Sequence, residues 1–577
     1  MKNKNLTCIR FNLFMSVIVL GIIVCVGIGC KKERSISSTA SPWLGDSIVQ
    51  TVYGKVKAPI DDSNTWVWKA IPYAKPPLGE LRWKAPQDPS PWDGIREEIE
   101  FSAVCPQYNN LKDIVGSEDC LYLNIWRPKS EEEDLPVYFW IHGGGNSIGS
   151  ANPYNGEILA LKANIIVITM NYRLGPFGWF THPALKSGKR GDEYDDSGNY
   201  GILDLIKALE WIRLNIRAFG GDSDNVTIAG ESAGAVDVSI LIISPPAEGL
   251  FHRAISQSSR QRLNSTEAGE ESAVDKIEKL LMNDGSAANR ASAKEYVANM
   301  SEAEIGVYLR SKTPVEILAC YDDAGNLGML GESFIDSFKD GDVIPEPGFE
   351  TLSSGTYPNK VPIILGSNKE EEKLFLFSDP FFEGKDELYQ IVTSHLSDLW
   401  KVSGVDDIAR TMRSHVHQPD VYVYQFLWGS GGDIGESVIP EPLGFKLGAS
   451  HALEIPFIFC GETYFGGFGP QYAYLDKIIF SDKNRPGREA LTNAMMGYVA
   501  QFVRTGNPNK PGSALPKWLP WSNEANVLKC ILFNADYERA DIRMSSEELT
   551  LEGVMDRVNK LEEPMLSEMK AYLESRH

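Results

Sequence analysis

Short apolar segments alternate with longer amphipathic ones from Val137 onward, and this alternation limits the possible folds of the chain more than any other feature. Residues 137–141 and 165–169 are apolar runs of strand length. Between Tyr200 and Phe219, apolar side chains recur every three or four residues, which predicts a helix packed on a sheet. Strands and helices that alternate in this way form a mostly parallel sheet with helices on both faces. We therefore predict an α/β fold with a central, twisted, mostly parallel sheet.

The chain has 577 residues, and large α/β enzymes often keep this much sequence around one sheet. Hydrophobic residues make up 43% and charged residues 23%, which is ordinary for a chain with a large core. We predict one domain over residues 46–577. Within it, residues 263–345 predict a helical cap over the site, after which strands resume at 361–365 and 421–426. Residues 536–577 predict a helical C-terminal tail.

The formal net charge of -22 bears on the class of partner. Nucleic acid and anionic lipid surfaces would repel such a chain at long range, so neither is expected to be a partner. The simplest consequence of the charge is solubility. We expect the partner to be a small molecule, and the sequence leaves the oligomeric state open.

The N-terminus has the pattern of a targeting segment. Lys2, Lys4 and Arg10 precede an almost wholly apolar run that ends at Gly29. The small residues before Cys30 resemble bacterial lipoprotein signals, which implies a signal over residues 1–30, lipidation of Cys30 and a polar linker over residues 31–45. The alternative is an uncleaved N-terminal transmembrane anchor, because the run is nearly long enough to span a bilayer. Both interpretations predict an exported, membrane-anchored domain, with the lipid or anchor as its membrane contact.

Export determines which cysteines remain in the folded part of the chain. Cys8, Cys25 and Cys30 belong to the targeting segment, so five cysteines remain in the folded part. Five is odd, and at least one of them is therefore unpaired. The chain has no C-x-x-C and no paired Cys/His spacing that would predict a zinc site, so no metal is expected. The five are Cys105, Cys120, Cys320, Cys460 and Cys530.

The segment Gly230-Glu-Ser-Ala-Gly234 matches G-x-S-x-G, the sharp strand-to-helix corner that exposes a serine hydroxyl. The pattern alone is weak, because Gly145-Asn-Ser-Ile-Gly149 matches it too. Only the match at Ser232 has a strand just before it and a helix just after it. Ser232 is therefore the predicted nucleophile, and Ser147 is predicted to lie in a loop.

A glycine run, His142-Gly-Gly-Gly145, directly follows the predicted strand at 137–141. Serine hydrolases with this corner place there a loop whose backbone N–H groups face the developing oxyanion. We predict Gly144, Gly145 and Ala233 as donors. The alternative is a plain turn, which the position after a strand and before the serine corner disfavours.

A serine nucleophile needs an imidazole oriented by a carboxylate, with the chain order Ser, acid, His in this type of fold. Of the late histidines, His451 lies in a small-residue loop, whereas the others lie in helical or polar surroundings or at the terminus. The predicted strand at 361–365 runs into a loop with three adjacent glutamates, Glu370, Glu371 and Glu372. These residues leave the acid ambiguous, and we expect two of the three to be solvated.

The chain resembles the type-B carboxylesterase and cholinesterase-like family, in which serine enzymes of the α/β-hydrolase fold hydrolyse carboxylic esters through an acyl-enzyme. The resemblance implies Ser232, Glu371 and His451 as the triad, with Gly144, Gly145 and Ala233 as the oxyanion hole. It also implies a disulfide between Cys105 and Cys120, an ester substrate, and no cofactor. The matching blocks lie between Gly54 and Phe533 and include Ala70–Gly79, Glu118–Asn124, Asn171–Gly175, Phe219–Asp222, Leu250–Ile255 and Arg504–Asn509.

Three positions depart from the family pattern. Glu372 stands where Gly is usual, Asn146 where an aromatic residue is usual, and Asp237 where Ser is common. The segment from Cys105 to Cys120 has no Trp to face a quaternary ammonium group, so a choline ester specialist is not expected. Competing hypotheses are a non-catalytic adhesion protein, which the intact triad disfavours, and an enzyme acting on amides, lactones or long-chain lipids.

Overall fold

The computed structural model describes residues 39–40, 42–60, 63–109, 111–321, 329–331, 334–430, 437–464 and 472–575. The predicted signal over residues 1–30, with Cys30, lies outside the described residues. In the described part, no helix is both long and apolar enough to cross a membrane.

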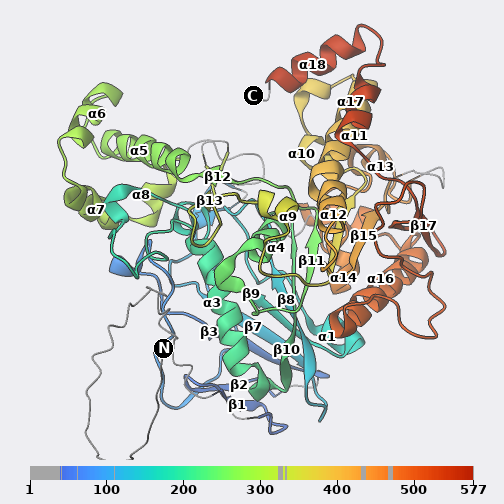
Figure 1. Ribbon diagram of the computed structural model, residues 1–577, viewed down its shortest axis with the longest axis horizontal. Coiled ribbons are helices and arrows are strands. Elements are labelled where there is room, and N and C mark those ends of the chain that lie inside the picture. The colour runs from blue at the N-terminus through green and yellow to red at the C-terminus, as the bar shows by residue number, and fades with distance from the viewer. Residues whose placement is uncertain are drawn as a thin grey trace, which may run out of the picture. The chain divides into compact units, whose positions relative to one another are not determined.

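A mixed, ten-stranded sheet forms the centre of the structure (Figure 1). All neighbours from β9 to β16 in the sheet order pair in parallel, which confirms the predicted mostly parallel sheet. The remaining pairs, at the two edges, are antiparallel. In spatial order the strands are β17 (Ala540–Ser545), β16 (Cys530–Ala535), β15 (Val421–Phe426), β14 (Ile363–Asn368), β11 (Arg253–Gln257), β10 (Gly221–Glu231), β8 (Leu135–Ile141), β9 (Ile166–Met170), β7 (Tyr122–Pro128) and β3 (Thr65–Pro72).

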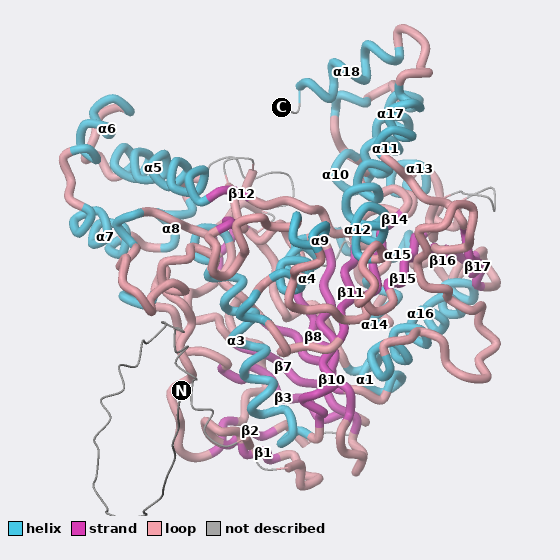
Figure 2. Tube along the Cα trace, viewed as in Figure 1, coloured by secondary structure: helices cyan, strands magenta, loops and turns pink. Residues whose placement is uncertain are grey.

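Strand β8 shows why the central strands are apolar throughout. Phe139 and its alternate neighbours enter one core with helices α3 (Tyr200–Asn215) and α4 (Ala233–Ile243). Tyr138 and Trp140 enter a second core with α1 (Glu157–Ala163) and α16 (Arg485–Thr505). A strand covered on both faces needs apolar side chains at every position rather than at every second one. Figure 2 shows helices on either side of the strands.

The carboxyl ends of four parallel strands lie side by side. Ile141 of β8 pairs with Gly230 of β10, Glu231 pairs with Gln257 of β11, and Gln257 pairs with Gly366 of β14. The loops that leave these strands therefore start from one edge of the sheet. Polar sites in open α/β sheets are built at this edge.

In its described residues, the predicted cap region, 263–345, contains four helices and two short strands. After the helices the chain forms the short strand β13, which pairs in parallel with β12, the strand that precedes them. The predicted role of this region as a cap remains a prediction. Its elements are β12 (Asn264–Ser265), α5 (Thr266–Asn283), α6 (Arg290–Ala298), α7 (Glu302–Ser311), α8 (Pro314–Leu318) and β13 (Phe338–Lys339).

The prediction of a helical C-terminal tail over residues 536–577 does not hold for its first part. β17 forms an edge strand that pairs antiparallel with β16. Its apolar residues alternate with polar ones, so that Ala540, Ile542 and Met544 pack on the core while Asp541 and Arg543 do not. Helices begin only with α17 (Leu551–Val558) and α18 (Met565–Ser575).

Candidate active site

Ser232 occupies a strained backbone position between β10 and α4. Its φ of 58° and ψ of -123° are unusual for a residue with a side chain. Glycine is required on both sides, because a Cβ at Gly230 would lie 2.4 Å from the carbonyl oxygen of Gly234, and a Cβ at Gly234 would lie 2.2 Å from that of Ile141. The Ser232 N–H donates to the Gln257 carbonyl at 2.9 Å. The sequence motif therefore forms the predicted corner, and the Ser232 side chain is half-buried.

The glycine run lies against this corner. A Cβ at Gly143 would lie 2.9 Å from the Ser232 Cβ, so the two backbones approach as closely as glycine permits. Gly144 and Gly145 have φ values of 107° and 60°, in the left-handed region that favours glycine. Ala233 begins α4, where the first N–H groups of a helix have no partner within it. The glycine loop therefore approaches Ser232 at Gly143, and Ala233 follows Ser232 at the start of α4.

Ser147, the second match to the motif, has a different role. It lies in the loop that follows the glycine run, and its Oγ accepts the N–H of Leu330 at 3.1 Å. The adjacent Met329 lies close to Gly145, with its Sδ 3.1 Å from the position of a Cβ there. A segment of the predicted cap region therefore lies on the glycine loop.

His451 and Glu371 are joined by a buried hydrogen bond. The imidazole Nδ1–H donates to Glu371 Oε2 at 2.6 Å. The other carboxylate oxygen, Oε1, accepts the N–H of Asn368 at 2.7 Å, which holds the carboxylate in place. His451 lies in the loop before α14 (Ile455–Phe459), and Glu371 follows β14, as predicted. A carboxylate at Nδ1 fixes the tautomer that leaves Nε2 free to act as a base.

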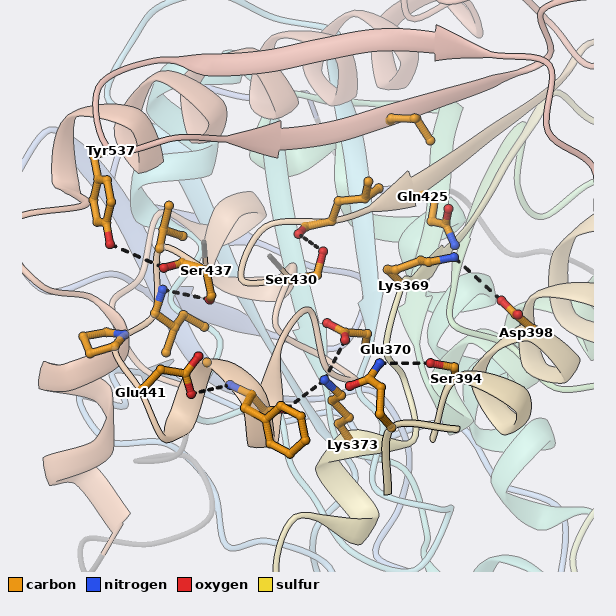
Figure 3. Close-up of a pocket in the computed structure, with 18 of the residues that line it drawn as sticks. Lys369, Glu370, Lys373, Ser394, Asp398, Gln425, Ser430, Ser437, Glu441 and Tyr537 are labelled. Atoms are coloured by element: carbon orange, nitrogen blue, oxygen red, sulfur yellow. Dashed lines mark hydrogen bonds and ion pairs between the residues drawn. The ribbon is translucent and has the colours of Figure 1, made fainter. Parts of the chain in front are cut away.

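The expectation that two of the three glutamates are solvated is wrong, because each has a partner and none is exposed. Glu370 accepts the N–H of Ala449 at 2.9 Å and forms an ion pair with Lys373 at 2.6 Å. It lines a cavity of about 1050 Å³ that includes neither Ser232 nor His451 (Figure 3). Glu372 is ion-paired with Arg260. Only Glu371 is bonded to the imidazole.

Glu231 is a site residue that the sequence analysis missed. Its Oε1 lies 3.0 Å from His451 Nε2, although it entered the motif only as a variable position. Burial raises the pKa of Glu231 to about 8. Burial alone would lower the pKa of His451, but the carboxylates of Glu231 and Glu371 outweigh it and raise this pKa to about 9. In the described residues, His451 Nε2 makes no hydrogen bond, to Ser232 Oγ or to any other atom, and the Glu231 carboxyl group lies beside it.

Glu454 is a second missed carboxyl group beneath the site. It accepts hydrogen bonds from Gln257 at 3.2 Å and from Asn368 at 2.6 Å. Burial, with the nearby charge of Glu371, raises its pKa to about 7. Glu454 lies three residues after His451 in the sequence, which places a carboxyl group near the base. Nothing in the local sequence shows that this side chain is buried.

Two of the departures from the family pattern contact each other. The Asn146 amide donates to Asp237 at 3.3 Å and to Asp336, from the predicted cap region, at 3.0 Å. Burial raises the pKa of both aspartates. The Tyr172 hydroxyl donates to the Asn146 side chain at 3.3 Å. This polar cluster fixes the backbone next to Gly145.

A disulfide joins Cys105 to Cys120, which is the pair that the resemblance implied. Within the described residues, Cys320, Cys460 and Cys530 form no disulfide. Among the residues that the structure describes, no group of three or more His, Cys, Asp or Glu side chains is arranged to hold a metal ion.

Comparison with known proteins identifies the family. A model of the carboxylesterase family matches residues 45–387 and 383–548. The chain is 29% identical to a para-nitrobenzyl esterase of Bacillus subtilis, over 83% of this chain and 94% of the relative. It is 32% identical to a medium-chain fatty acyl-CoA hydrolase precursor of Anas platyrhynchos, over 89% and 91%.

Solved structures agree with this result. The structure is similar to a para-nitrobenzyl esterase, with a TM-score of 0.67, 28% identity, and coverage of 89% of this chain and 99% of the other. It is also similar to a Geobacillus stearothermophilus carboxylesterase, with a TM-score of 0.66, 30% identity, and coverage of 86% and 98%. The chain therefore belongs to the carboxylesterase family and is a serine-type carboxylic ester hydrolase of the α/β-hydrolase fold.

Proposed function

We propose that Ser232 is the nucleophile of this ester hydrolase, His451 its general base and Glu371 the carboxylate that orients the base. The observation that carries the proposal is the 2.6 Å bond between His451 and Glu371, next to a serine on a strained strand-to-helix corner. His451 removes the Ser232 proton as the serine oxygen attacks the ester carbonyl. The imidazolium then protonates the leaving alcohol, and water activated by the same imidazole releases the acid.

The oxyanion of each tetrahedral intermediate rests on the N–H groups of Gly144, Gly145 and Ala233. The close approach of Gly143 to Ser232 supports this assignment, because it brings the glycine loop to the serine. Backbone donors fixed before the reaction stabilise the developing charge without a cost of reorganisation. Met329, which contacts Gly145, supports a role for residues 263–345 as a cap that forms one wall of the acyl site.

Glu231 competes with Ser232 for the imidazole. Nε2 lies 3.0 Å from the Glu231 carboxyl group. Catalytic hydrogen bonds are often loose before substrate binds and tighten in the reacting complex. Nε2 therefore turns from Glu231 to Ser232 for the attack, and in the acyl-enzyme it is available to take a proton from the attacking water.

The proposal is tested with two serine variants. Ser232→Ala removes the hydroxyl at the corner, whereas Ser147→Ala removes the hydroxyl of the other motif match. We expect Ser232→Ala to abolish the burst of p-nitrophenol from p-nitrophenyl acetate and labelling by a fluorophosphonate. Ser147→Ala should retain both. Hydrolysis at the parent rate by Ser232→Ala would reject the mechanism.

The substrate is a small carboxylic ester. The relatives named for para-nitrobenzyl esters and for medium-chain acyl-CoA support an acyl or alcohol group of moderate size. A series of p-nitrophenyl esters from acetate to palmitate measures the preferred length. Matching anilides and lactones test the competing amide and lactone activities.

We also propose that the domain is exported and held at a membrane by lipid on Cys30. The apolar N-terminal run and the small residues before Cys30 support this assignment. A palmitate analogue fed to expressing cells should label the parent chain but not Cys30→Ser. Equal labelling of the two would reject lipidation and favour the uncleaved anchor.

A further inference from the structure

Arg260 places a guanidinium group next to the site from a loop with no helix or strand. It follows β11, whose last residue, Gln257, accepts the Ser232 N–H. The guanidinium carbon lies 3.5 Å from the centre of the Trp400 ring, and Nη2 donates to Glu372. The Arg260 side chain is nevertheless 49% exposed. An anchored cation is thus presented to solvent close to the end of the sheet.

Trp400, at the end of α11 (Asp386–Lys401), links this cation to the proposed base. The centre of its ring lies 4.8 Å from that of His451. Its indole N–H donates to the carbonyls of Ser258 at 3.1 Å and Ser259 at 3.0 Å, so the ring is fixed to the loop that carries Arg260. One aromatic ring therefore contacts both the guanidinium and the imidazole.

The Arg260 guanidinium has hydrogen-bond donors that are not used within the described residues. In the described part of the chain, only its Nη2 donates a hydrogen bond, to Glu372, and Nε and Nη1 donate none. A guanidinium is a planar fork that binds carboxylate or phosphate through two donors, and stacking on an aromatic face holds it in one plane. Trp400 and Glu372 thus restrict the rotation of Arg260 in advance, which lowers the entropic cost of binding an anion.

We propose that Arg260 selects ester substrates that carry an anionic group in their acyl or alcohol part. The proposal rests on the proposed function, since it assumes that the ester is cleaved at Ser232 beside His451. The new proposal goes beyond that function by naming the charge class of the substrate. The net charge of -22 would repel such substrates at long range. A cation held at the site attracts them locally, which the rest of the surface does not do.

Arg262 offers a matched control. It lies two residues further along the same loop, is exposed, and carries the same charge. In the described residues no aromatic ring stacks on it and no carboxylate is hydrogen-bonded to it, although its charge acts on the pKa of Asp336. A general effect of surface charge would be lost equally in Arg260→Gln and Arg262→Gln, whereas a binding contact would be lost only in Arg260→Gln.

The test compares kcat/KM of the full chain for esters of similar length whose terminal groups differ in charge. The acyl series is p-nitrophenyl hexanoate, mono-p-nitrophenyl adipate and p-nitrophenyl ω-aminohexanoate. The alcohol series is the acetate ester of p-hydroxybenzoate and that of its methyl ester. We expect Arg260→Gln to lower the ratio of anionic to neutral turnover about fivefold in at least one series, the upper end of what an exposed ion pair supplies. Turnover of the neutral esters and the ratio in Arg262→Gln should stay at parent values.

Three outcomes would overturn the proposal. An equal loss on neutral and anionic esters would make Arg260 a support for Trp400 and His451 without a role in selection. Unchanged ratios in both series would reject any contact with the substrate. A parent preference for the ω-aminohexanoate that rises in Arg260→Gln would point to cationic substrates. Failure of the proposed function is distinguishable, because it would appear as Ser232→Ala turning over the neutral hexanoate.

Discussion

His451 Nε2 lies 3.0 Å from Glu231 Oε1, so the proposed base faces the carboxyl group of the residue directly before the proposed nucleophile. Both groups are buried, and the pKa of each is raised, Glu231 to about 8 and His451 to about 9. Each of the two groups therefore favours its protonated form more than it would in water.

The first prediction concerns the pH dependence of the reaction. A base must be unprotonated, so kcat/KM falls as the pH drops below the pKa at which the Glu231–His451 pair loses its last proton. In Glu231→Gln one of the carboxylates that raise the pKa of His451 is gone. We expect the acid limb of the profile to move to lower pH by about one unit. The measurement is kcat/KM for p-nitrophenyl butyrate against pH.

The control for this shift is Glu370→Gln. This variant removes a carboxylate next to Glu371, but one that pairs with Lys373 and not with the imidazole. Its acid limb should coincide with that of the parent. A limb in Glu231→Gln that stays in place, or moves to higher pH, would contradict the role assigned to Glu231.

The second prediction separates the three adjacent glutamates. Glu371→Gln keeps the shape of the side chain but presents an amide to His451 Nδ1, which no longer favours the required tautomer or stabilises the imidazolium. We expect kcat to fall by a factor of about a thousand or more. Glu370→Gln should retain most of the activity, since Glu370 is bonded to Lys373 and to the backbone of Ala449. Comparable losses in Glu371→Gln and Glu370→Gln would contradict the assignment of Glu371, rather than Glu370, as the acid of the triad.

Local geometry explains why the corner at Ser232 was predictable. An apolar strand, a glycine on either side of the serine and a helix directly after it are all visible within about twenty residues of sequence, and the crowding that demands glycine is a backbone property. The central strands were predictable for a similar reason. Burial on both faces leaves a continuous apolar run such as that of β8, which no solvated strand shows.

The partners of the carboxylates could not be predicted from the same kind of pattern. Glu371 and His451 are separated by 80 residues, and nothing local distinguishes Glu371 from Glu370 or Glu372. The family resemblance supplied that choice. The ion pair of Arg260 with Glu372 joins residues that are 112 positions apart. The three adjacent glutamates, which the sequence suggests are solvated, each contact a different partner in the folded chain.

The third prediction concerns the disulfide between Cys105 and Cys120, which closes a loop with a sequence separation of 15. A crosslink of this span removes conformations from the unfolded chain and stabilises the folded state by about 3 kcal/mol. The double variant Cys105→Ser/Cys120→Ser should therefore have a lower thermal midpoint. Cys460→Ser, which alters a free and half-buried thiol, should melt close to the parent. Equal midpoints for the parent and the double variant under oxidising conditions would show that the bridge contributes nothing.

The last prediction returns to the glycines at the serine corner. A methyl group at Gly234 would lie 2.2 Å from the carbonyl oxygen of Ile141 and 2.8 Å from that of His142. These carbonyls belong to the end of β8 and the start of the glycine loop, so relief of the clash separates α4 from the strand and the oxyanion donors from Ser232. We expect Gly234→Ala to lower the free energy of unfolding by about 1–3 kcal/mol, as overpacking does in tight interiors, and to lower kcat.

The matched variant is Gly497→Ala in α16, where the nearest atom to the new methyl group, Leu515 Cδ1, is 3.6 Å away. Alanine favours a helix over glycine by about 1 kcal/mol, so this variant should keep or raise the thermal midpoint while leaving kcat unchanged. Thermal unfolding followed by circular dichroism, with esterase assays on the same samples, compares the two. If Gly234→Ala melted and turned over like Gly497→Ala, the contact between α4 and β8 would have to be looser than these distances, and the proposed placement of the oxyanion donors would fail with it.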